Sequence, residues 1–191
     1  MKWLKTYESF VENPKFFRFS QTDILGGKES MEILPKENEY MVGDPKFIEV
    51  LIDLGFPDLR KCIHFMDENT FKQGEFYKNL YGNYTYQVNI DDNSTLGWSF
   101  MTPVNDWWYK SNPYNHLKKE KDSVRELDMT GYGQVDFEEA SSEELKLEIK
   151  KLVDFGFIGT GKLNDLMNAK FWGRERVFIW TSDKVKIENH R

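Results

Sequence analysis

The sequence predicts an α+β fold, and three observations support this class. Stretches with helical spacing of apolar residues and stretches with strand-like alternation both occur along the chain. They do not follow one another in the regular strand-helix alternation of a doubly wound parallel sheet. The chain also ends on two strand-like runs joined by the turn residues Ser182 and Asp183. We therefore expect a mixed or largely antiparallel sheet with several flanking helices and a C-terminal strand pair, in which the last two strands form a hairpin.

The whole chain, residues 1–191, is expected to fold as a single domain. A chain of this length buries roughly two-thirds of its unfolded surface without metals or disulfides. Hydrophobic residues make up 39% and aromatic residues 16% of the sequence, which is typical of an ordered globular protein. No internal repeat, low-complexity tract or long linker divides the chain.

Capping residues mark two of the expected helices. Asp44 and Pro45 fit an N-cap and a first helical turn, and Gly55 fits the C-terminal end. Ser141 and Glu144 fit a capping box that begins another helix. The remaining elements follow from apolar spacing and alternation. In chain order, the expected helices span 3–12, 44–55, 67–80, 115–127, 141–156 and 163–171, and the expected strands span 15–20, 61–66, 85–90, 98–100, 176–181 and 185–187.

The composition argues against several classes of partner. The formal net charge of −6 opposes general nucleic-acid binding, and the lysine-rich run 118–121 is interrupted by an acid. No apolar run approaches the ~18 residues that span a bilayer, and the first residues do not resemble a signal peptide. The sequence contains one cysteine, Cys62, which favours a reducing compartment. We expect a soluble, cytoplasmic protein with no membrane or nucleic-acid partner.

A stretch after the helix expected over 141–156 nearly matches a phosphate-binding loop. Residues 156–162 fit the spacing G-x-x-x-x-G-K, but Leu163 stands where the motif needs a serine or threonine to hold Mg²⁺. The stretch also follows an expected helix instead of a strand. The same glycines are needed where a helix ends and the chain turns. We therefore interpret it as a helix end and a turn, without nucleotide binding.

No metal site is expected from the sequence. The three histidines, His64, His116 and His190, are not spaced as two ligands on one helix face, and neither HExxH nor CxxC is present. Residues 91–102 begin like a calcium-binding loop. The glycine is displaced, however, and Thr102 replaces the glutamate that such a loop requires.

Cys62 and His64 alternate on an expected strand and can share one face of it. Their Cβ atoms would lie about 6.5 Å apart along the strand, so we expect no direct hydrogen bond between them. Without that contact the histidine cannot activate the thiol, and no G-x-S-x-G nucleophile motif is present. We interpret Cys62 as a small core residue and His64 as a hydrogen-bonded core histidine.

The densest group of aromatic residues lies between Gly97 and His116, in the stretch GWSFMTPVNDWWYKSNPYNH. Trp98 and Phe100 alternate like residues of a core strand. The consecutive tryptophans that follow cannot both lie on one face, and polar residues are interleaved with them, as at binding hot spots. Packing of the whole stretch in the core is the alternative. The predicted partner-binding residues are Trp107, Trp108, Tyr109, Lys110, Tyr114 and His116.

The preferred functional hypothesis is therefore a soluble protein that binds a macromolecular partner, most simply a protein, through this aromatic surface. An accessory or inhibitory protein of a phage or mobile element is one form of the hypothesis, because the sequence is rich in Lys, Asn, Phe and Tyr. A virion structural component is a different alternative. No cofactor is expected under these hypotheses.

The remaining alternative is an enzyme, and it depends on a resemblance in layout. Arg18 in the run FFRFS, a later strand with His64 in the pair HF, and the C-terminal strand pair resemble the arrangement of mono-ADP-ribosyltransferase-like folds. The resemblance implies a transferase that uses NAD, with Arg18, His64 and Glu175 as catalytic residues. No serine-threonine-serine element precedes Glu175, and Arg176 rather than a second acid leads into the last strands.

Overall fold

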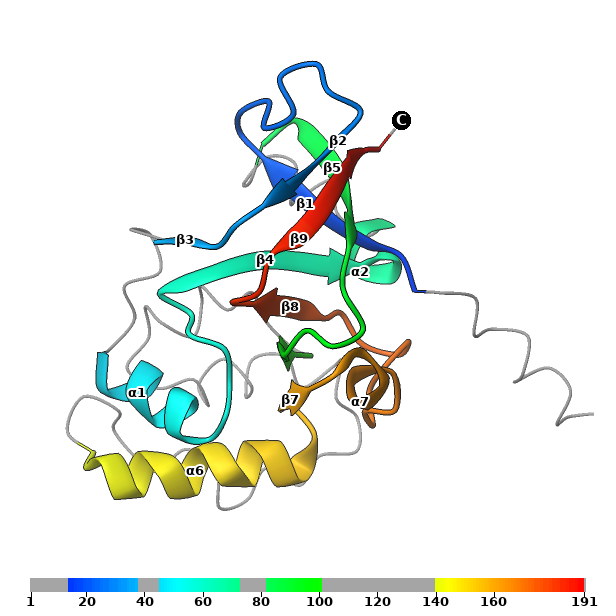
Figure 1. Cartoon of the computed structure of the whole chain (residues 1–191). Helices are drawn as coiled ribbons and strands as arrows, with labels where there is room; N and C mark the ends of the chain where they lie inside the picture. Colours follow the sequence, from blue (N-terminus) through cyan, green and yellow to red (C-terminus); the bar gives the residue numbers. More distant parts are fainter. Residues whose placement is uncertain (1–13, 38–44, 73–81, 101–139, 191) are drawn as a thin grey trace, which may run out of the picture.

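The computed structural model describes residues 14–37, 45–72, 82–100 and 140–190, which form nine strands and four helices (Figure 1). The strands are β1 (Phe16–Ser20), β2 (Ser30–Ile33), β3 (Lys36–Glu37), β4 (Lys61–Asp67), β5 (Tyr84–Asn89), β6 (Leu96–Ser99), β7 (Ile158–Gly161), β8 (Phe178–Thr181) and β9 (Val185–Asn189). The helices are α1 (Pro45–Asp53), α2 (Glu68–Lys72), α6 (Ser142–Phe155) and α7 (Leu163–Met167). Every pairing between these strands is antiparallel, so the predicted α+β class with a largely antiparallel sheet is confirmed.

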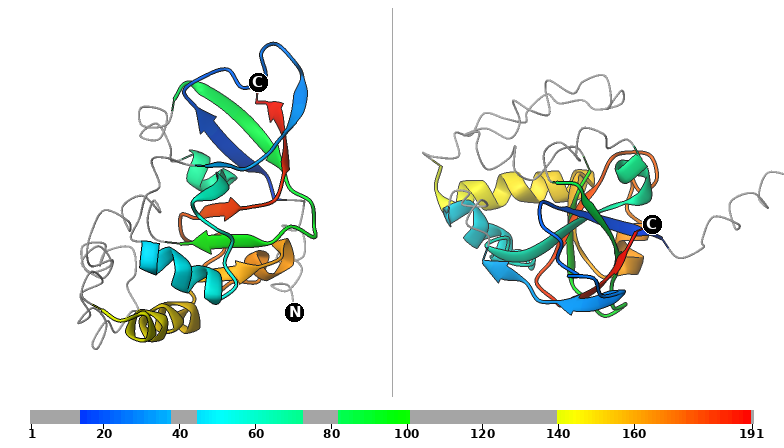
Figure 2. Two further views of the ribbon diagram at one scale, coloured as in Figure 1. Left: turned by 60° about the vertical axis from the view of Figure 1, so that its left-hand side comes forward. Right: turned by 90° about the horizontal axis from the view of Figure 1, so that it is seen from above.

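Strand β4 lies within the sheet and uses both of its edges. The strands follow the order β2-β9-β5-β1-β4-β8-β6-β7, and β3 pairs with β4 outside this path. β1 pairs with Met66 and Asp67 at the end of β4, whereas β3 pairs with Lys61 and Cys62 at its start. β1 and β3 lie above β4 in Figure 1, and β8 lies below it. The sheet therefore curls back on itself through β2 and β3 (Figure 2), and residues 63–65 of β4 lie between the two short pairings.

The inner face of the curled sheet forms an apolar core. Phe16, Val88 and Ile187 lie side by side on β1, β5 and β9, and all three are buried. Strand alternation places Arg18 on this same face, opposite Tyr86 on β5. The fold therefore carries a charged side chain onto a face that is lined mostly by apolar and aromatic residues.

Two tryptophan–glycine pairs hold the strands beyond β4 together. Trp180 on β8 faces Gly97 on β6, and Trp98 on β6 faces Gly159 on β7. A Cβ atom added at Gly97 would lie 2.3 Å from Trp180 Cε2, and one added at Gly159 would lie 2.4 Å from Trp98 Cε2. Each indole therefore occupies the space that a side chain at the facing position would need. Aromatic residues that cover strand glycines in this way help to fix the register of a sheet.

The C-terminal part of the chain contains most of the elements expected there. α6 begins with the predicted capping box of Ser141 and Glu144 and ends at Gly156, whose φ of 92° favours glycine. Both C-terminal strands are present, but the expected hairpin between them is wrong. β8 pairs with β4 and β6, whereas β9 pairs with β2 and β5. Turn residues between two strands allow a change of direction, and they do not decide which strands pair.

Other expected elements differ from the structure. Within the described part of the expected helix 67–80, Asp67 ends β4, and its carboxylate accepts a hydrogen bond from the Thr70 amide in α2. The glycine-rich stretch after α6 continues as strand β7, and the loop expected before α1 contains β2 and β3. The helices expected over 3–12 and 115–127 lie outside the described residues.

Candidate functional site

Arg18 and His64 meet at the part of β4 that pairs with neither β1 nor β3. Arg18 Nη1 donates a hydrogen bond to the backbone carbonyl oxygen of His64 at 3.0 Å. The described residues offer Arg18 no other hydrogen bond, and Arg18 Nε is buried without a partner. The guanidinium therefore supplies the donor that a neighbouring strand would otherwise provide where β1 diverges from β4.

Cys62 and His64 are in direct contact, so the expectation that they are too far apart to interact is wrong. Cys62 Sγ lies 3.3 Å from His64 Nε2 and 3.1 Å from the carbonyl oxygen of Leu59. The expected separation applied to the Cβ atoms along the strand, but the imidazole extends toward the thiol and closes that distance. A thiol has a single proton, so it donates either to Leu59 or to the imidazole at any moment.

Both members of the Cys62–His64 pair are uncharged near neutral pH. Burial raises the pKa of the Cys62 thiol to about 12, although the nearby charge of Arg18 opposes this rise. Burial also lowers the pKa of His64 to about 3, and the charge of Arg18 adds to this effect. Reactive cysteines depend on a thiolate, which a neighbouring imidazolium often stabilises. A neutral thiol beside a neutral imidazole is suited to packing and hydrogen bonding instead.

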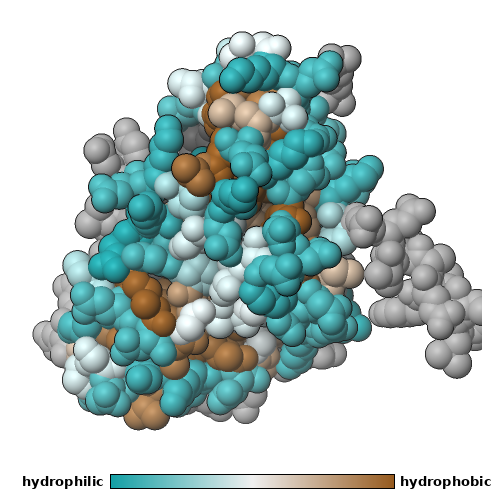
Figure 3. All heavy atoms as spheres, viewed as in Figure 1, coloured by the Kyte–Doolittle hydropathy of each residue, from teal (hydrophilic) through white to brown (hydrophobic). Residues whose placement is uncertain are grey.

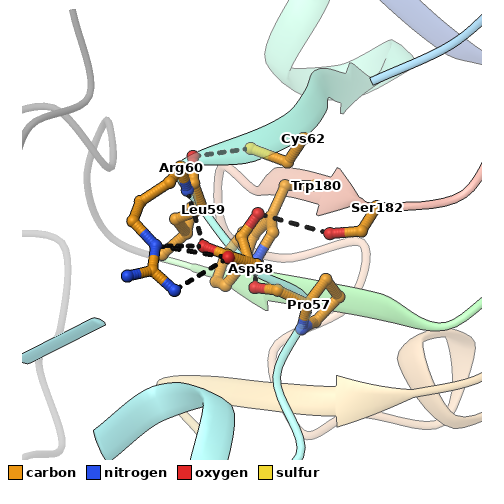
Figure 4. Close-up of polar contacts among 7 residues, drawn as sticks. All are labelled: Pro57, Asp58, Leu59, Arg60, Cys62, Trp180 and Ser182. Atoms are coloured by element: carbon orange, nitrogen blue, oxygen red, sulfur yellow. Dashed lines mark hydrogen bonds and ion pairs between the residues drawn. The ribbon is translucent and has the colours of Figure 1, made fainter. Parts of the chain in front are cut away.

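The connection between α1 and β4 is held against the sheet by side chains that bond its backbone carbonyl groups (Figure 4). The clearest contact joins Trp180 Nε1 to the carbonyl oxygen of Pro57 at 3.1 Å, and Phe56 stacks on the same indole with ring centroids 6.1 Å apart. Cys62 bonds to Leu59 in the same connection, so it belongs to a part of the fold that several hydrogen bonds hold in place. The donor and acceptor residues of this connection are Thr160 and Gly55, Trp180 and Pro57, Ser182 and Asp58, and Cys62 and Leu59.

Glu175 does not join Arg18 and His64 in this region. It lies in the turns between α7 and β8, where its amide donates to the carbonyl oxygen of Phe171. The residue paired with His64 is Trp180, further along β8. Glu175 is also not among the groups that shift the pKa of Arg18 or His64. The structure therefore brings together two of the three residues that the ADP-ribosyltransferase resemblance implies.

The structure describes the residues on either side of the stretch 101–139, which contains the predicted partner-binding residues. Phe100 is fully buried, and its amide donates to the carbonyl oxygen of Phe157 at 2.9 Å. Ala140 is buried, and its carbonyl oxygen accepts a hydrogen bond from Lys46 Nζ at 2.6 Å. The predicted partner-binding residues Trp107, Trp108, Tyr109, Lys110, Tyr114 and His116 themselves lie outside the described residues.

The sequence alone predicts Cys62 and His64 as separate core residues, and it misses both the contact between them and the contact of His64 with Arg18. The spacing Cys-x-His within an expected strand is the signal that points to the first contact, because alternate residues share a face. The second contact has no local signal. Arg18 and His64 are 46 residues apart, and they meet because β1 and β4 become neighbours in the folded sheet.

No metal centre is found in the part of the chain that the structure describes. There, no three His, Cys, Asp or Glu side chains are grouped closely enough to hold an ion. The helices among these residues are also too short or too polar to cross a membrane.

Comparison of the chain with protein-family models, with curated proteins and with solved structures found no match. The functional argument therefore depends on the geometry and chemistry of the residues themselves.

Proposed function

We propose that the protein binds a macromolecular partner, most simply another protein, through the aromatic and polar residues between Trp107 and His116. The observation that supports this proposal is the attachment of the surrounding segment at both ends, at Phe100 beside Phe157 and at Ala140 beside α1. Binding residues occur preferentially on connections that a rigid scaffold holds in place.

The surface formed by the described residues has few large exposed apolar side chains that a partner could recognise. Its most exposed large apolar side chains, Leu34, Tyr84 and Leu147, lie in separate parts of the chain. On the face shown in Figure 3, apolar surface forms small groups that polar residues separate. Recognition surfaces are usually larger and contiguous. The aromatic concentration in the middle of the sequence is therefore the better candidate.

The chemistry of Cys62 and His64 also favours binding over catalysis. Cys62 Sγ and His64 Nε2 are in contact, and both groups are neutral near pH 7. A resting thiol with a pKa of about 12 provides almost no thiolate for attack on a substrate. The pair therefore supports a scaffold that holds its recognition residues elsewhere.

Affinity capture with the full chain tests the proposal. The double variant Trp107→Ala/Tyr109→Ala removes two predicted contact residues. Tyr84→Ala removes an exposed tyrosine on β5 and serves as the matched control. Proteins that the wild type and the control capture, and that the double variant loses, are then purified for calorimetric titration. We expect the double variant to bind at least tenfold more weakly, which corresponds to about 1.4 kcal/mol.

Circular dichroism and urea unfolding establish whether the variants fold like the wild type. If all three proteins fold alike and bind the same partner with equal affinity, the proposed surface is wrong. Light scattering of the purified protein addresses the virion alternative, because a structural component assembles into large particles whereas a binding protein of this kind stays small.

The contact between Arg18 and His64 supports a second proposal, a transferase that uses NAD. Titration with millimolar NAD should then shift the NMR signals of residues around Arg18, and the wild type should release nicotinamide. The absence of both shifts and nicotinamide release would remove this candidate.

A further inference from the structure

One nitrogen of the Arg18 guanidinium makes a hydrogen bond, and the other two have no hydrogen-bond partner among the described residues. Nη1 donates to the carbonyl oxygen of His64 at 3.0 Å. Nε is buried and unpaired, and no described residue accepts a hydrogen bond from Nη2. Nε and Nη2 together form the edge that holds two oxygen atoms of a carboxylate or phosphate group at once.

Arg60 shows how the same edge is filled elsewhere in this chain. Its Nε donates to Asp58 Oδ1 at 3.0 Å, and its Nη2 donates to Asp58 Oδ2 at 3.0 Å. This pair lies on exposed surface, where solvent already screens the charges. Arg18 is less exposed than Arg60, yet the described residues provide no carboxylate at its free edge.

Among the described residues, no carboxylate is bonded to the Arg18 guanidinium. Surrounding protein atoms displace water from the group, and this desolvation lowers its pKa. Cys62 is the neighbour whose ionised form would favour the charged guanidinium, but its thiol keeps its proton at neutral pH. Asp23 is near Tyr86, which lies opposite Arg18, but its carboxylate already accepts from the Tyr86 hydroxyl and from amides of its own turn. A cation removed from water is unfavourable unless an anion offsets it.

We propose that Arg18 is the centre of a binding site for a small oxyanion, a phosphate or carboxylate group held by the Nε and Nη2 edge of the guanidinium. The oxyanion would accept two hydrogen bonds there and would supply the missing negative charge. The adjacent thiol of Cys62 and imidazole of His64 are neutral, so they do not repel it. The proposal involves none of the proposed partner-binding residues, so its test does not depend on them. It shares Arg18 with the NAD-using alternative, and release of nicotinamide is required by that alternative alone.

The decisive experiment is an NMR titration of the ¹⁵N-labelled full chain with sodium phosphate, and separately with sodium acetate, while sodium chloride keeps the ionic strength constant. The Nε–H signal of Arg18 and the backbone amides of Cys62 and His64 report on the site. We expect a saturable shift of these signals. Tighter binding of phosphate than of acetate would identify a phosphate-bearing ligand, and the reverse order would identify a carboxylate.

Arginine-to-lysine variants supply a matched control. Arg18→Lys keeps the positive charge and loses the bidentate edge, so the affinity measured at the Cys62 and His64 amides should fall at least tenfold. Arg60→Lys should leave that affinity unchanged, because Asp58 already occupies the corresponding edge of Arg60. The proposal is overturned if the Nε–H signal of Arg18 in the wild type does not shift. It is also overturned if that signal shifts linearly with both salts, without saturation, in the same way as the signal of Arg60. That result is read from the wild type, so it stands even if Arg18→Lys fails to fold.

Discussion

Arg18 and His64 are joined by a hydrogen bond of 3.0 Å at the place where the neighbours of β4 separate. β1 pairs with β4 at Met66, and β3 pairs with it at Cys62, so the backbone between these residues has no described strand on that side. The Arg18 guanidinium provides a donor there, and an unpaired backbone carbonyl group inside a protein is costly. The charge of Arg18 is therefore tied to the closure of the curled sheet.

Two substitutions at Arg18 should separate the packing of its stem from its charge. Arg18→Ala should lower the free energy of unfolding by about 2–4 kcal/mol, because it removes the bond to His64 together with the apolar stem. Arg18→Met also leaves the His64 carbonyl group unpaired, but it keeps most of the stem, and removal of a desolvated charge offsets that cost. We therefore expect it to lie within about 1 kcal/mol of the wild type. Urea unfolding followed by tryptophan fluorescence measures both values. Equal destabilisation by the two variants would show that the stem contributes little.

The packing of Trp180 on Gly97 predicts a large cost for a small substitution. The Cβ atom of Gly97→Ala would lie 2.3 Å from Trp180 Cε2, so the indole must move and weaken its bond to Pro57. We expect a loss of about 3 kcal/mol or more in the free energy of unfolding. Gly27→Ala is the control, because its Cβ atom would meet nothing and its positive φ alone costs about 1 kcal/mol. Similar losses for both variants would contradict the packing argument.

Local patterns predicted the parts of the fold whose causes are local. The capping box at Ser141 depends on neighbouring residues, and it is present as expected. The strand character of Gly159 could not be predicted in this way, because it depends on Trp98 lying opposite and filling the space above it. The candidate site divides similarly. Strand alternation places Cys62 and His64 on one face, but it does not predict their contact, because that contact depends on how far the imidazole reaches. The approach of Arg18 requires knowledge of which strands pair.

A buried hydroxyl group joins α2 to the segment before β8. Thr70 is fully buried, and its Oγ1 accepts a hydrogen bond from the Val177 amide at 2.8 Å. Thr70→Val keeps the shape and leaves that amide unpaired, so the free energy of unfolding should fall by about 1–3 kcal/mol. Thr70→Ser keeps the hydroxyl and should cost about 1 kcal/mol for the lost methyl group. Hydrogen exchange at Val177 should accelerate more in the valine variant than in the serine variant, and the opposite order would refute the bond.

Thiol chemistry should report on Cys62 alone, because the chain contains one cysteine. The pKa of this thiol is raised to about 12 by burial, so at pH 8 the folded protein should hold about 1,000-fold less thiolate than the unfolded chain. Ellman's reagent should therefore react much more slowly in buffer than in urea. Between about pH 9 and pH 12 the thiol keeps its proton in the folded state and loses it in the unfolded chain. The free energy of unfolding should therefore fall as the pH rises through this range. Equal reaction rates in buffer and in urea would show that the thiol is not shielded.

His64 should make the fold less stable in acid. Its pKa is lowered from 6.5 to about 3, first by burial and then by the charge of Arg18. Between these values the unfolded chain binds a proton that the folded chain does not, so the free energy of unfolding should fall as the pH is lowered from 6.5 toward 3. The contribution of this group is up to about 1.4 kcal/mol per pH unit.

His64→Gln removes this titration while keeping a polar side chain on β4. Its unfolding free energy should therefore fall less steeply than that of the wild type between pH 6.5 and pH 4. The imidazole signals of His64 provide a direct measurement, since they should keep their neutral values throughout that range. A titration midpoint near pH 6.5 would mean that water and protons reach the ring freely, and the neutral contact with Cys62 would then not describe the folded protein.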